Sequence, residues 1–181
     1  MILETALQVV DRFDPGHADR VAKLTFDLSQ ALGYEKKDAR EFYLAARYHD
    51  IGKIAIPKAV LQKRGELTQE ETRLLQKHVE YGMRMTRYIK NNLIRSIIAT
   101  HHEHWDGNGY PHRLKGENIP LCGRIVAICD VYDALTTDRP YRAAWSHDKA
   151  ASYIRERSGT QFDPFLVEPF LRVVVPVGGT V

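Results

Sequence analysis

The chain has 181 residues and an ordinary globular composition, with 44% hydrophobic and 27% charged residues. This length suits one domain with a substantial core, and we expect that domain to span residues 1–181. The net charge of +3 is compatible with a small anionic substrate, but it is too small to indicate a duplex nucleic-acid binder. No apolar run approaches the length of a membrane span.

Two features of the sequence favour the cytoplasm. Glu4, Asp11 and Asp14 interrupt the N-terminal segment where a secretory signal would need a continuous apolar run. Cys122 and Cys129 lie seven positions apart, which is about 10 Å along a helix and too far for a disulfide. We therefore expect a cytoplasmic domain without a bond between these cysteines.

Apolar periodicity and capping residues predict an almost entirely helical chain. The expected helices cover residues 2–11, His17 to Gly33, 38–50, a segment that starts at Thr68 and carries His78, 92–103, 120–137, a segment capped by Ser146, and a last one that starts at Asp163-Pro164. Segment 105–111 is dense in turn formers and is expected to be a loop. No repeat or linker stands out, and the valines at 173–175 are not assigned to any element.

Two histidines are expected to point toward the core. His17 extends the apolar stripe of the second helix at its N-terminal end. His49 shares a face with Ala45 and Ala46 on the third predicted helix. Inward histidines on separate helices are one way to build a buried metal site.

The segment His49-Asp50-Ile51-Gly52-Lys53 concentrates groups that suit phosphate-ester chemistry. His49 offers a ring nitrogen, Asp50 offers two oxygens that can bridge two metal ions, and Lys53 offers a positive charge. Because neighbours on a helix point about 100° apart, His49 and Asp50 fit a two-ion centre with the carboxylate between the ions. Further candidate donors elsewhere in the chain are His17, His78, His101, His102 and Asp130.

Two divalent ions roughly 3.5–4 Å apart can polarise a phosphoryl group and generate a hydroxide nucleophile at neutral pH. Histidine and carboxylate donors without a thiolate favour iron, manganese or zinc. The donor set therefore predicts a metal-assisted hydrolase that acts on a phosphate ester.

Each candidate also has an ordinary structural explanation. His17 and His78 are typical of hydrogen-bonded core histidines, and Asp130 is typical of a solvated or salt-bridged acid. Lys53 suits the negative end of a helix dipole. Asp133 is expected to hydrogen-bond to a ligand rather than to be one. The histidines interpreted as surface or loop residues are His104, His112 and His147.

Four motifs, in order, resemble the HD-GYP domain family over nearly the whole chain. They are residues 49–57 (HDIGKIAIP), 101–111 (HHEHWDGNGYP), 130–142 (DVYDALTTDRPYR) and 159–164 (GTQFDP). The second motif contains the GYP loop for which the family is named, and other HD hydrolases lack it. Because four motifs of this length occur in the family's order, they are stronger evidence for the family than the separate residues are.

The resemblance implies an all-α, single-domain HD-superfamily helical bundle with the GYP loop beside the metal site. It implies a phosphodiesterase that hydrolyses cyclic di-GMP to linear pGpG, with GMP as a further product. One ion would be held by His17, His49, Asp50 and Asp130, and the other by Asp50, His78, His101 and His102. Lys53 would contact the scissile phosphate, and the other substrate-binding positions would be Tyr110, Arg139 and Arg142.

Two positions depart from the family pattern. Family members that bind three metal ions carry a glutamate at the position of Phe13. Because phenylalanine cannot ligate a metal, we expect two ions here and incomplete conversion of the substrate to GMP. The usual proline after His78 is Val79, for which we expect little effect. Most members carry a sensory or receiver domain before this one, and none occurs in these residues. Two possibilities therefore stay open: the chain is a stand-alone domain, or it is a fragment of a longer protein.

The resemblance leads to a hypothesis of in-line hydrolysis. A water activated by the two ions attacks phosphorus, Lys53 and the ions stabilise the developing charge, and the GYP loop forms a lid or wall. Iron or manganese is the expected metal, with zinc or nickel in purified material. Two alternatives stay open: a phosphohydrolase of another nucleotide or cyclic dinucleotide, and a regulatory module with little turnover that binds the nucleotide or a signalling domain through its GYP loop.

Overall fold

The computed structural model describes residues 2–138 and 143–175. Its elements are α1 (Ile2–Asp11), α2 (His17–Ala31), α3 (Lys36–Ala46), η1 (Ile51–Ala55), α4 (Lys58–Leu61), α5 (Gln69–Gln76), α6 (His78–Met85), α7 (Asn92–Thr100), η2 (Gly116–Asn118), α8 (Leu121–Thr136), α9 (His147–Glu156) and α10 (Pro164–Val174). No strand occurs among these residues, so the expected all-α fold is confirmed. Within the same ranges, no helix is long and apolar enough to cross a membrane.

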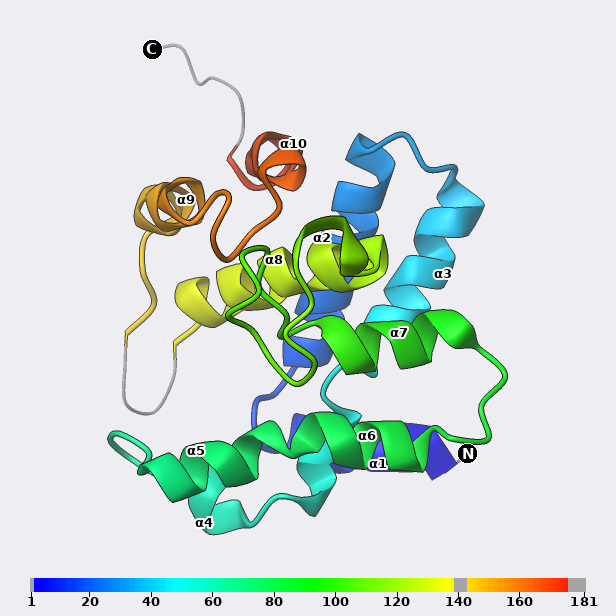
Figure 1. Cartoon of the computed structure of the whole chain (residues 1–181), viewed down its shortest axis with the longest axis vertical. Coiled ribbons are helices and arrows are strands. Elements are labelled where there is room, and N and C mark those ends of the chain that lie inside the picture. The colour runs from blue at the N-terminus through cyan, green and yellow to red at the C-terminus, as the bar shows by residue number, and fades with distance from the viewer. Residues whose placement is uncertain (1, 139–142, 176–181) are drawn as a thin grey trace.

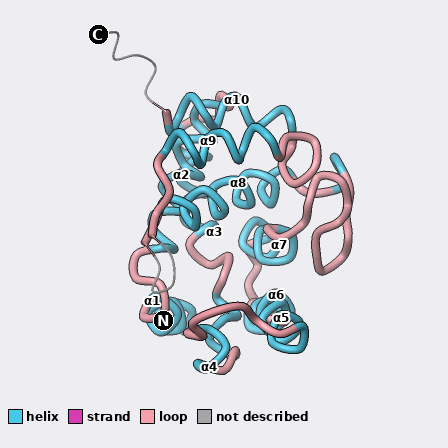
Figure 2. Tube along the Cα trace, turned by 90° about the vertical axis from the view of Figure 1, so that its left-hand side faces the viewer, coloured by secondary structure: helices cyan, strands magenta, loops and turns pink. Residues whose placement is uncertain are grey.

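The helices form two groups with the candidate site between them. Helices α2, α3, α8, α9 and α10 lie in the upper part of the molecule, and α1, α4, α5 and α6 lie in the lower part (Figures 1 and 2). Helix α8 is the centre of the core and packs against α2, α7, α9 and α10. It is buried on most sides, because Ile125, Val126, Ile128 and Cys129 are all inaccessible to solvent. The buried surface of α8 therefore extends beyond a single face of the helix.

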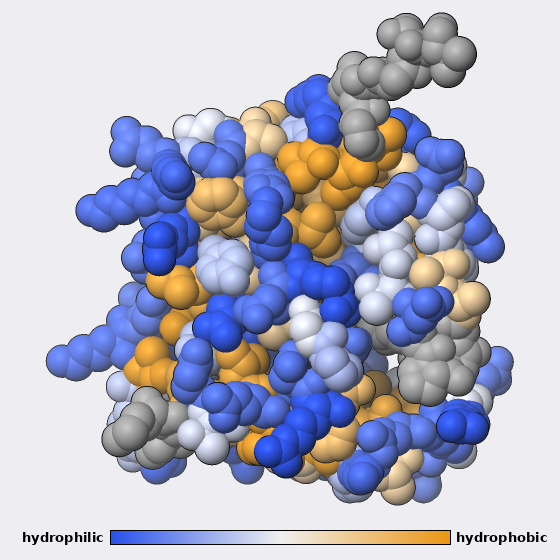
Figure 3. Space-filling view, turned by 180° about the vertical axis from the view of Figure 1, so that it is seen from behind, coloured by the Kyte–Doolittle hydropathy of each residue, from blue (hydrophilic) through white to orange (hydrophobic). Residues whose placement is uncertain are grey.

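The rear face of the molecule is mostly polar (Figure 3). Figure 3 shows hydrophilic side chains over most of the rear face, with apolar side chains between them in small groups. Both cysteines, Cys122 and Cys129, are buried in α8 and free, as their spacing predicted.

Local capping signals are confirmed where the sequence predicts them. The Thr68 hydroxyl accepts a hydrogen bond from Glu71 N, and the Glu71 carboxylate accepts one from Thr68 N, which is a complete capping box. Ser146 caps α9, and the Asp163 carboxylate caps α10 at Phe165 N. These contacts span three residues or fewer, so short-range sequence signals are sufficient to predict them.

Two helix boundaries differ from the prediction. The helix expected over 38–50 ends at Ala46, and His49 and Asp50 lie in a turn before η1. The backbone tightens there to i→i−3 hydrogen bonds, such as His49 N to Ala46 O at 3.1 Å. The helix expected from Thr68 through His78 divides into α5 and α6 at Lys77. The valines at 173 and 174, which had no assignment, end α10.

The early end of α3 follows from the packing of η1 against α6. Gly52 approaches the backbone of α6 so closely that a Cβ atom built on it would lie 1.9 Å from His78 O and 2.5 Å from Gly82 N. A continuous helix through residue 50 would carry Gly52 away from this contact. The close approach places Asp50 beside His78.

Candidate metal and phosphate site

Five separate segments contribute the candidate donors. His17 begins α2, His49 and Asp50 occupy the turn before η1, and His78 begins α6. His101 and His102 directly follow α7, and Asp130 lies in α8. All of these segments meet between the upper and lower groups of helices. The structure thus brings together donors that are up to 113 positions apart in the sequence, from His17 to Asp130.

The donor atoms form two groups that share Asp50. In one group, atoms of Asp50, His78, His101 and His102 all lie within 4.8 Å of one another, and in the other, atoms of His17, His49 and Asp50 do so. Asp130 adjoins the second group, because its Oδ1 lies 3.2 Å from His17 Nε2 and 3.9 Å from His49 Nε2. The residues of the two ligand sets that the resemblance implies thus lie together, with the Asp50 carboxylate between them, and their role as metal ligands stays a prediction.

Backbone carbonyls fix the orientation of three imidazole rings. Nδ1 of His49 lies 2.9 Å from Ala46 O, Nδ1 of His78 lies 2.7 Å from Leu75 O, and Nδ1 of His101 lies 3.1 Å from Ile97 O. Since a carbonyl can only accept, each Nδ1 carries the hydrogen, and each Nε2 presents its lone pair to the centre. This is the arrangement that orients histidine ligands in metal sites.

Four buried atoms at the centre have no hydrogen-bond partner among the residues that the structure describes. They are Nε2 of His49, His78 and His101, and Oδ1 of Asp50. Buried polar atoms are almost always paired, because desolvation without a partner costs about 1–3 kcal/mol each. Three lone pairs and a carboxylate oxygen that converge in this way are satisfied by cations. The residues therefore fit divalent metal ions.

Burial and charge keep these donors in ligating form. Burial lowers the pKa of His78 to about 4, and burial together with the neighbouring histidines lowers the pKa of His102 well below its usual range, so both rings are neutral at pH 7. Burial raises the pKa of Asp50, but the positive charge of Lys53 opposes this effect, and the pKa of the carboxyl lies well below its usual value. Neutral imidazoles and an ionised carboxylate are what a divalent cation requires.

His17 is held by carboxylates on both ring nitrogens. Its Nδ1 lies 2.7 Å from Asp133 Oδ2, and its Nε2 faces Asp130 and Asp50. Burial lowers the pKa of His17, but these hydrogen bonds outweigh it and raise the pKa to about 11. The space between His17 Nε2 and the two carboxylates thus favours positive charge.

Asp133 has the supporting position that the sequence predicts, and it is itself held by a residue that the sequence analysis missed. Arg20 Nε donates to Asp133 Oδ1 at 2.6 Å, and Arg20 Nη2 donates to Asp133 Oδ2 at 3.1 Å. Arg20 lies three positions after His17, on the same face of α2. That spacing is the signal that could have pointed to it.

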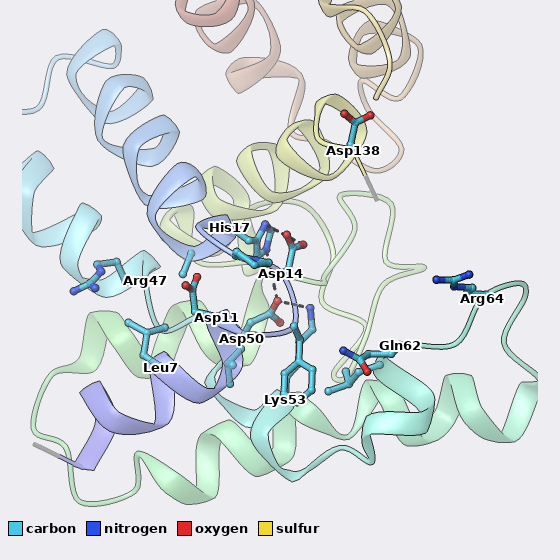
Figure 4. A pocket seen from close by; sticks show the side chains of 15 residues that line it. Leu7, Asp11, Asp14, His17, Arg47, Asp50, Lys53, Gln62, Arg64 and Asp138 are labelled. Carbon is cyan, nitrogen blue, oxygen red and sulfur yellow. Dashed lines mark hydrogen bonds and ion pairs between the residues drawn. The ribbon is translucent and has the colours of Figure 1, made fainter. Parts of the chain in front are cut away.

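A cavity of about 770 Å³ opens beside the centre. Its lining includes His17, Asp50 and Lys53, and Lys53 Nζ forms an ion pair with Asp50 Oδ2 (Figure 4). Phe13 also lines the cavity, from the segment between α1 and α2. A volume of this size suits a ligand as large as a dinucleotide.

The GYP loop contacts the centre at His102. The Tyr110 ring stacks on His102 with 4.7 Å between centroids and an angle of 20°, and Tyr110 N donates to His102 O at 3.0 Å. Tyr110 is not among the described residues that line the 770 Å³ cavity. Its assignment as a substrate contact remains a prediction, and so do those of Arg139 and Arg142, which lie outside the described residues.

A buried glutamate holds the GYP loop in place. Glu103 is 2% exposed, and its two carboxylate oxygens accept hydrogen bonds from His112 N at 2.7 Å and from Leu114 N at 3.0 Å. These bonds tie the end of the loop to its beginning. The sequence analysis missed this residue, although it stands inside the GYP motif directly after the paired histidines.

We expect Glu103→Ala to loosen this loop and to lower the free energy of unfolding by about 2–3 kcal/mol, since two charge-assisted hydrogen bonds are lost. Hydrogen exchange of the amides of His112 and Leu114 should accelerate, and a thermal melt should show the lost stability. The matched control is Glu117→Ala, at an exposed position in the segment that follows the loop. Unchanged exchange at His112 in Glu103→Ala would contradict this role.

The geometry defines a class: a helical domain with a histidine and carboxylate centre for two cations, beside a large open cavity. The HD domain family profile matches residues 2–166. The chain belongs to this family, and its motifs and relatives place it in the HD-GYP group.

The relatives are longer proteins. The chain is 40% identical to the 3'3'-cGAMP-specific phosphodiesterase 2 of Vibrio cholerae over 93% of its own length and 33% of that protein. It is 47% identical to a cyclic di-GMP phosphodiesterase of the same organism over 72% of its own length and 28% of that protein. The chain thus spans about a third or less of these two relatives.

A solved structure supports the fold. The HDG"Y"P protein Bd1817 from Bdellovibrio bacteriovorus superposes with a TM-score of 0.73 over 87% of this chain and 51% of that chain, at 21% identity. At this identity the likeness concerns the fold alone. It confirms the expected HD-superfamily helical bundle.

Proposed function

We propose that the chain is a metal-dependent phosphodiesterase that hydrolyses cyclic di-GMP to linear pGpG through a two-ion centre. The observation that carries the proposal is the pair of donor groups that share Asp50 beside the 770 Å³ cavity. Cyclic di-GMP phosphodiesterases among the relatives support the choice of substrate. The proposed location is the cytoplasm, where a signalling nucleotide would be met.

The proposed ligands are the two sets of donors described above. His17, His49, Asp50 and Asp130 would hold one ion, and Asp50, His78, His101 and His102 would hold the other. When bound, two such ions supply Lewis acidity and a nucleophile at neutral pH. Iron or manganese is the proposed metal, although the affinity order favours nickel and zinc in purified protein.

The protein's own residues would position the substrate. Lys53 reaches the cavity from η1 and is paired with Asp50, so its ammonium lies beside the carboxylate that the two donor groups share. There it would contact the scissile phosphate and stabilise charge that develops on the phosphoryl oxygens. Asp50 would thus serve both as a metal ligand and as the anchor of this lysine.

Phe13 bears on the number of ions and on the product. It lines the cavity next to Asp14, and a phenyl ring offers no donor atom. We therefore propose two ions per chain and accumulation of linear dinucleotide rather than full conversion to GMP. The GYP loop is also proposed as a surface for other signalling domains.

The first test is anaerobic reconstitution with Fe(II) or Mn(II), followed by incubation with cyclic di-GMP and chromatography of the products. Two metal ions per chain and accumulating pGpG are expected. Fast conversion to GMP would support the proposed phosphodiesterase activity but contradict the inference from Phe13 that linear dinucleotide accumulates. Nucleotide binding without any product would contradict the proposed enzymatic activity and favour a regulatory module.

A second candidate substrate is 3'3'-cGAMP, because the relative that matches 93% of this chain is specific for it. Parallel assays with cyclic di-GMP and 3'3'-cGAMP, compared by kcat/KM, distinguish the two. A higher kcat/KM for 3'3'-cGAMP would replace the first choice of substrate.

A further inference from the structure

The cavity lining contains a positively charged side chain, Arg64, that takes no part in the candidate metal centre. Of the described lining residues, three are arginine or lysine: Arg47, Lys53 and Arg64. Two of these are engaged by carboxylates. Arg47 donates to Asp19 at 2.8 Å and to Glu4 at 3.1 Å, and Lys53 is paired with Asp50. No carboxylate among the described residues forms an ion pair or hydrogen bond with Arg64.

The acids of the cavity have other partners. Asp11 accepts from Gly16 N at 2.7 Å, Asp138 accepts from Ala144 N at 2.8 Å, and Asp14 lies 3.5 Å from an Arg20 nitrogen. Together with Asp50 they place four carboxylates in the lining. An anionic ligand in this cavity therefore needs a cation that these acids have not neutralised, and Arg64 has that property.

Arg64 also lies away from the metal centre. Figure 4 shows Arg47 and Arg64 at opposite sides of the cavity, with Asp50 between them. The segment that carries Arg64 follows α4 and is tied to the next helix, because Lys63 Nζ donates to Glu71 Oε2 at 2.5 Å. Glu71 is in turn part of the capping box of α5. The guanidinium thus extends from an anchored segment.

A cyclic dinucleotide has two phosphodiester groups on one ring. When one is placed at Asp50 and Lys53 for cleavage, the other lies elsewhere in the cavity and keeps its negative charge. A guanidinium binds a phosphate through paired, charge-assisted hydrogen bonds. We propose that Arg64 binds this second phosphate, and so selects cyclic dinucleotides over simple phosphodiesters. This inference rests on the proposed function.

The test compares a two-phosphate substrate with a one-phosphate substrate. For cyclic di-GMP, Arg64→Ala is expected to raise KM about tenfold with little change in kcat, and Arg64→Lys should recover part of the loss. For bis(p-nitrophenyl) phosphate, which has a single phosphate, Arg64→Ala should leave KM within about twofold. Arg84→Ala is the matched control, because Arg84 pairs with Glu80 on α6 and does not line the cavity.

Three outcomes would overturn the inference. One is an unchanged KM for cyclic di-GMP in Arg64→Ala, and another is an equal loss with both substrates. The third is a result from Kd values measured with cyclic di-GMP and cyclic di-AMP. If Arg64→Ala weakens the binding of cyclic di-GMP but not of cyclic di-AMP, Arg64 contacts the guanine base rather than the phosphate. Wild-type turnover with an unaffected Arg64→Ala overturns this inference alone, whereas a wild-type protein that binds no cyclic dinucleotide overturns the proposed function as well.

Discussion

Asp50→Asn is expected to remove bound metal and to reduce phosphodiesterase activity by about a thousandfold or more, which corresponds to about 4 kcal/mol of transition-state stabilisation. Asp50 belongs to both donor groups and pairs with Lys53, so one substitution affects both proposed ions and the proposed phosphate contact. An amide has nearly the same shape as the carboxylate but no charge. The fold should therefore persist while the centre loses its shared anion.

The measurements are metal content after anaerobic reconstitution, pGpG formation, and far-ultraviolet circular dichroism. The matched control is Asp27→Asn, since Asp27 pairs with Lys23 on an outer face of α2 and takes no part in the centre. Asp27→Asn should keep both metal and activity. An Asp50→Asn protein with full activity would refute the proposed two-ion centre.

Gly52→Ala is expected to lower the free energy of unfolding by about 3 kcal/mol or more, through overpacking in a close-packed interior. The added methyl would lie 1.9 Å from His78 O and 2.5 Å from Gly82 N, and both are backbone atoms that cannot rotate away. To relieve the clash, η1 must separate from α6. Because Asp50 and His78 flank this contact, the metal affinity should fall as well.

Gly82→Ala is the informative comparison, because the same interface is altered from the other side. A methyl at Gly82 would lie 2.9 Å from a side-chain methyl of Ile98 rather than within 2.5 Å of two backbone atoms, and alanine favours the helical backbone of α6. We expect a much smaller loss of stability than in Gly52→Ala. Urea unfolding of the metal-free variants gives both free energies, and equal losses would contradict the role of backbone contact at Gly52.

Several elements of the fold could be predicted because their signals act over short distances. The Thr68–Glu71 capping box and the Asp163-Pro164 start of α10 depend on residues within one helical turn. The inward position of His17 follows from the apolar stripe of its own helix, and His17 is indeed buried. The same periodicity failed at residues 47–50, because the packing of Gly52 on α6 ends α3 early.

The sequence by itself determined the helical class, the order of the motifs and the types of donor atom available for metal ions. It could not determine that His17 meets Asp133, 116 positions away, or that Asp50 lies between two groups of histidines. Nor did it indicate that Glu103 ties the GYP loop, or that Arg64 faces the cavity without a carboxylate partner among the described residues. The tertiary structure decided these points, because such contacts depend on how helices pack across the core, whereas local propensity acts only within a few residues of each helix end.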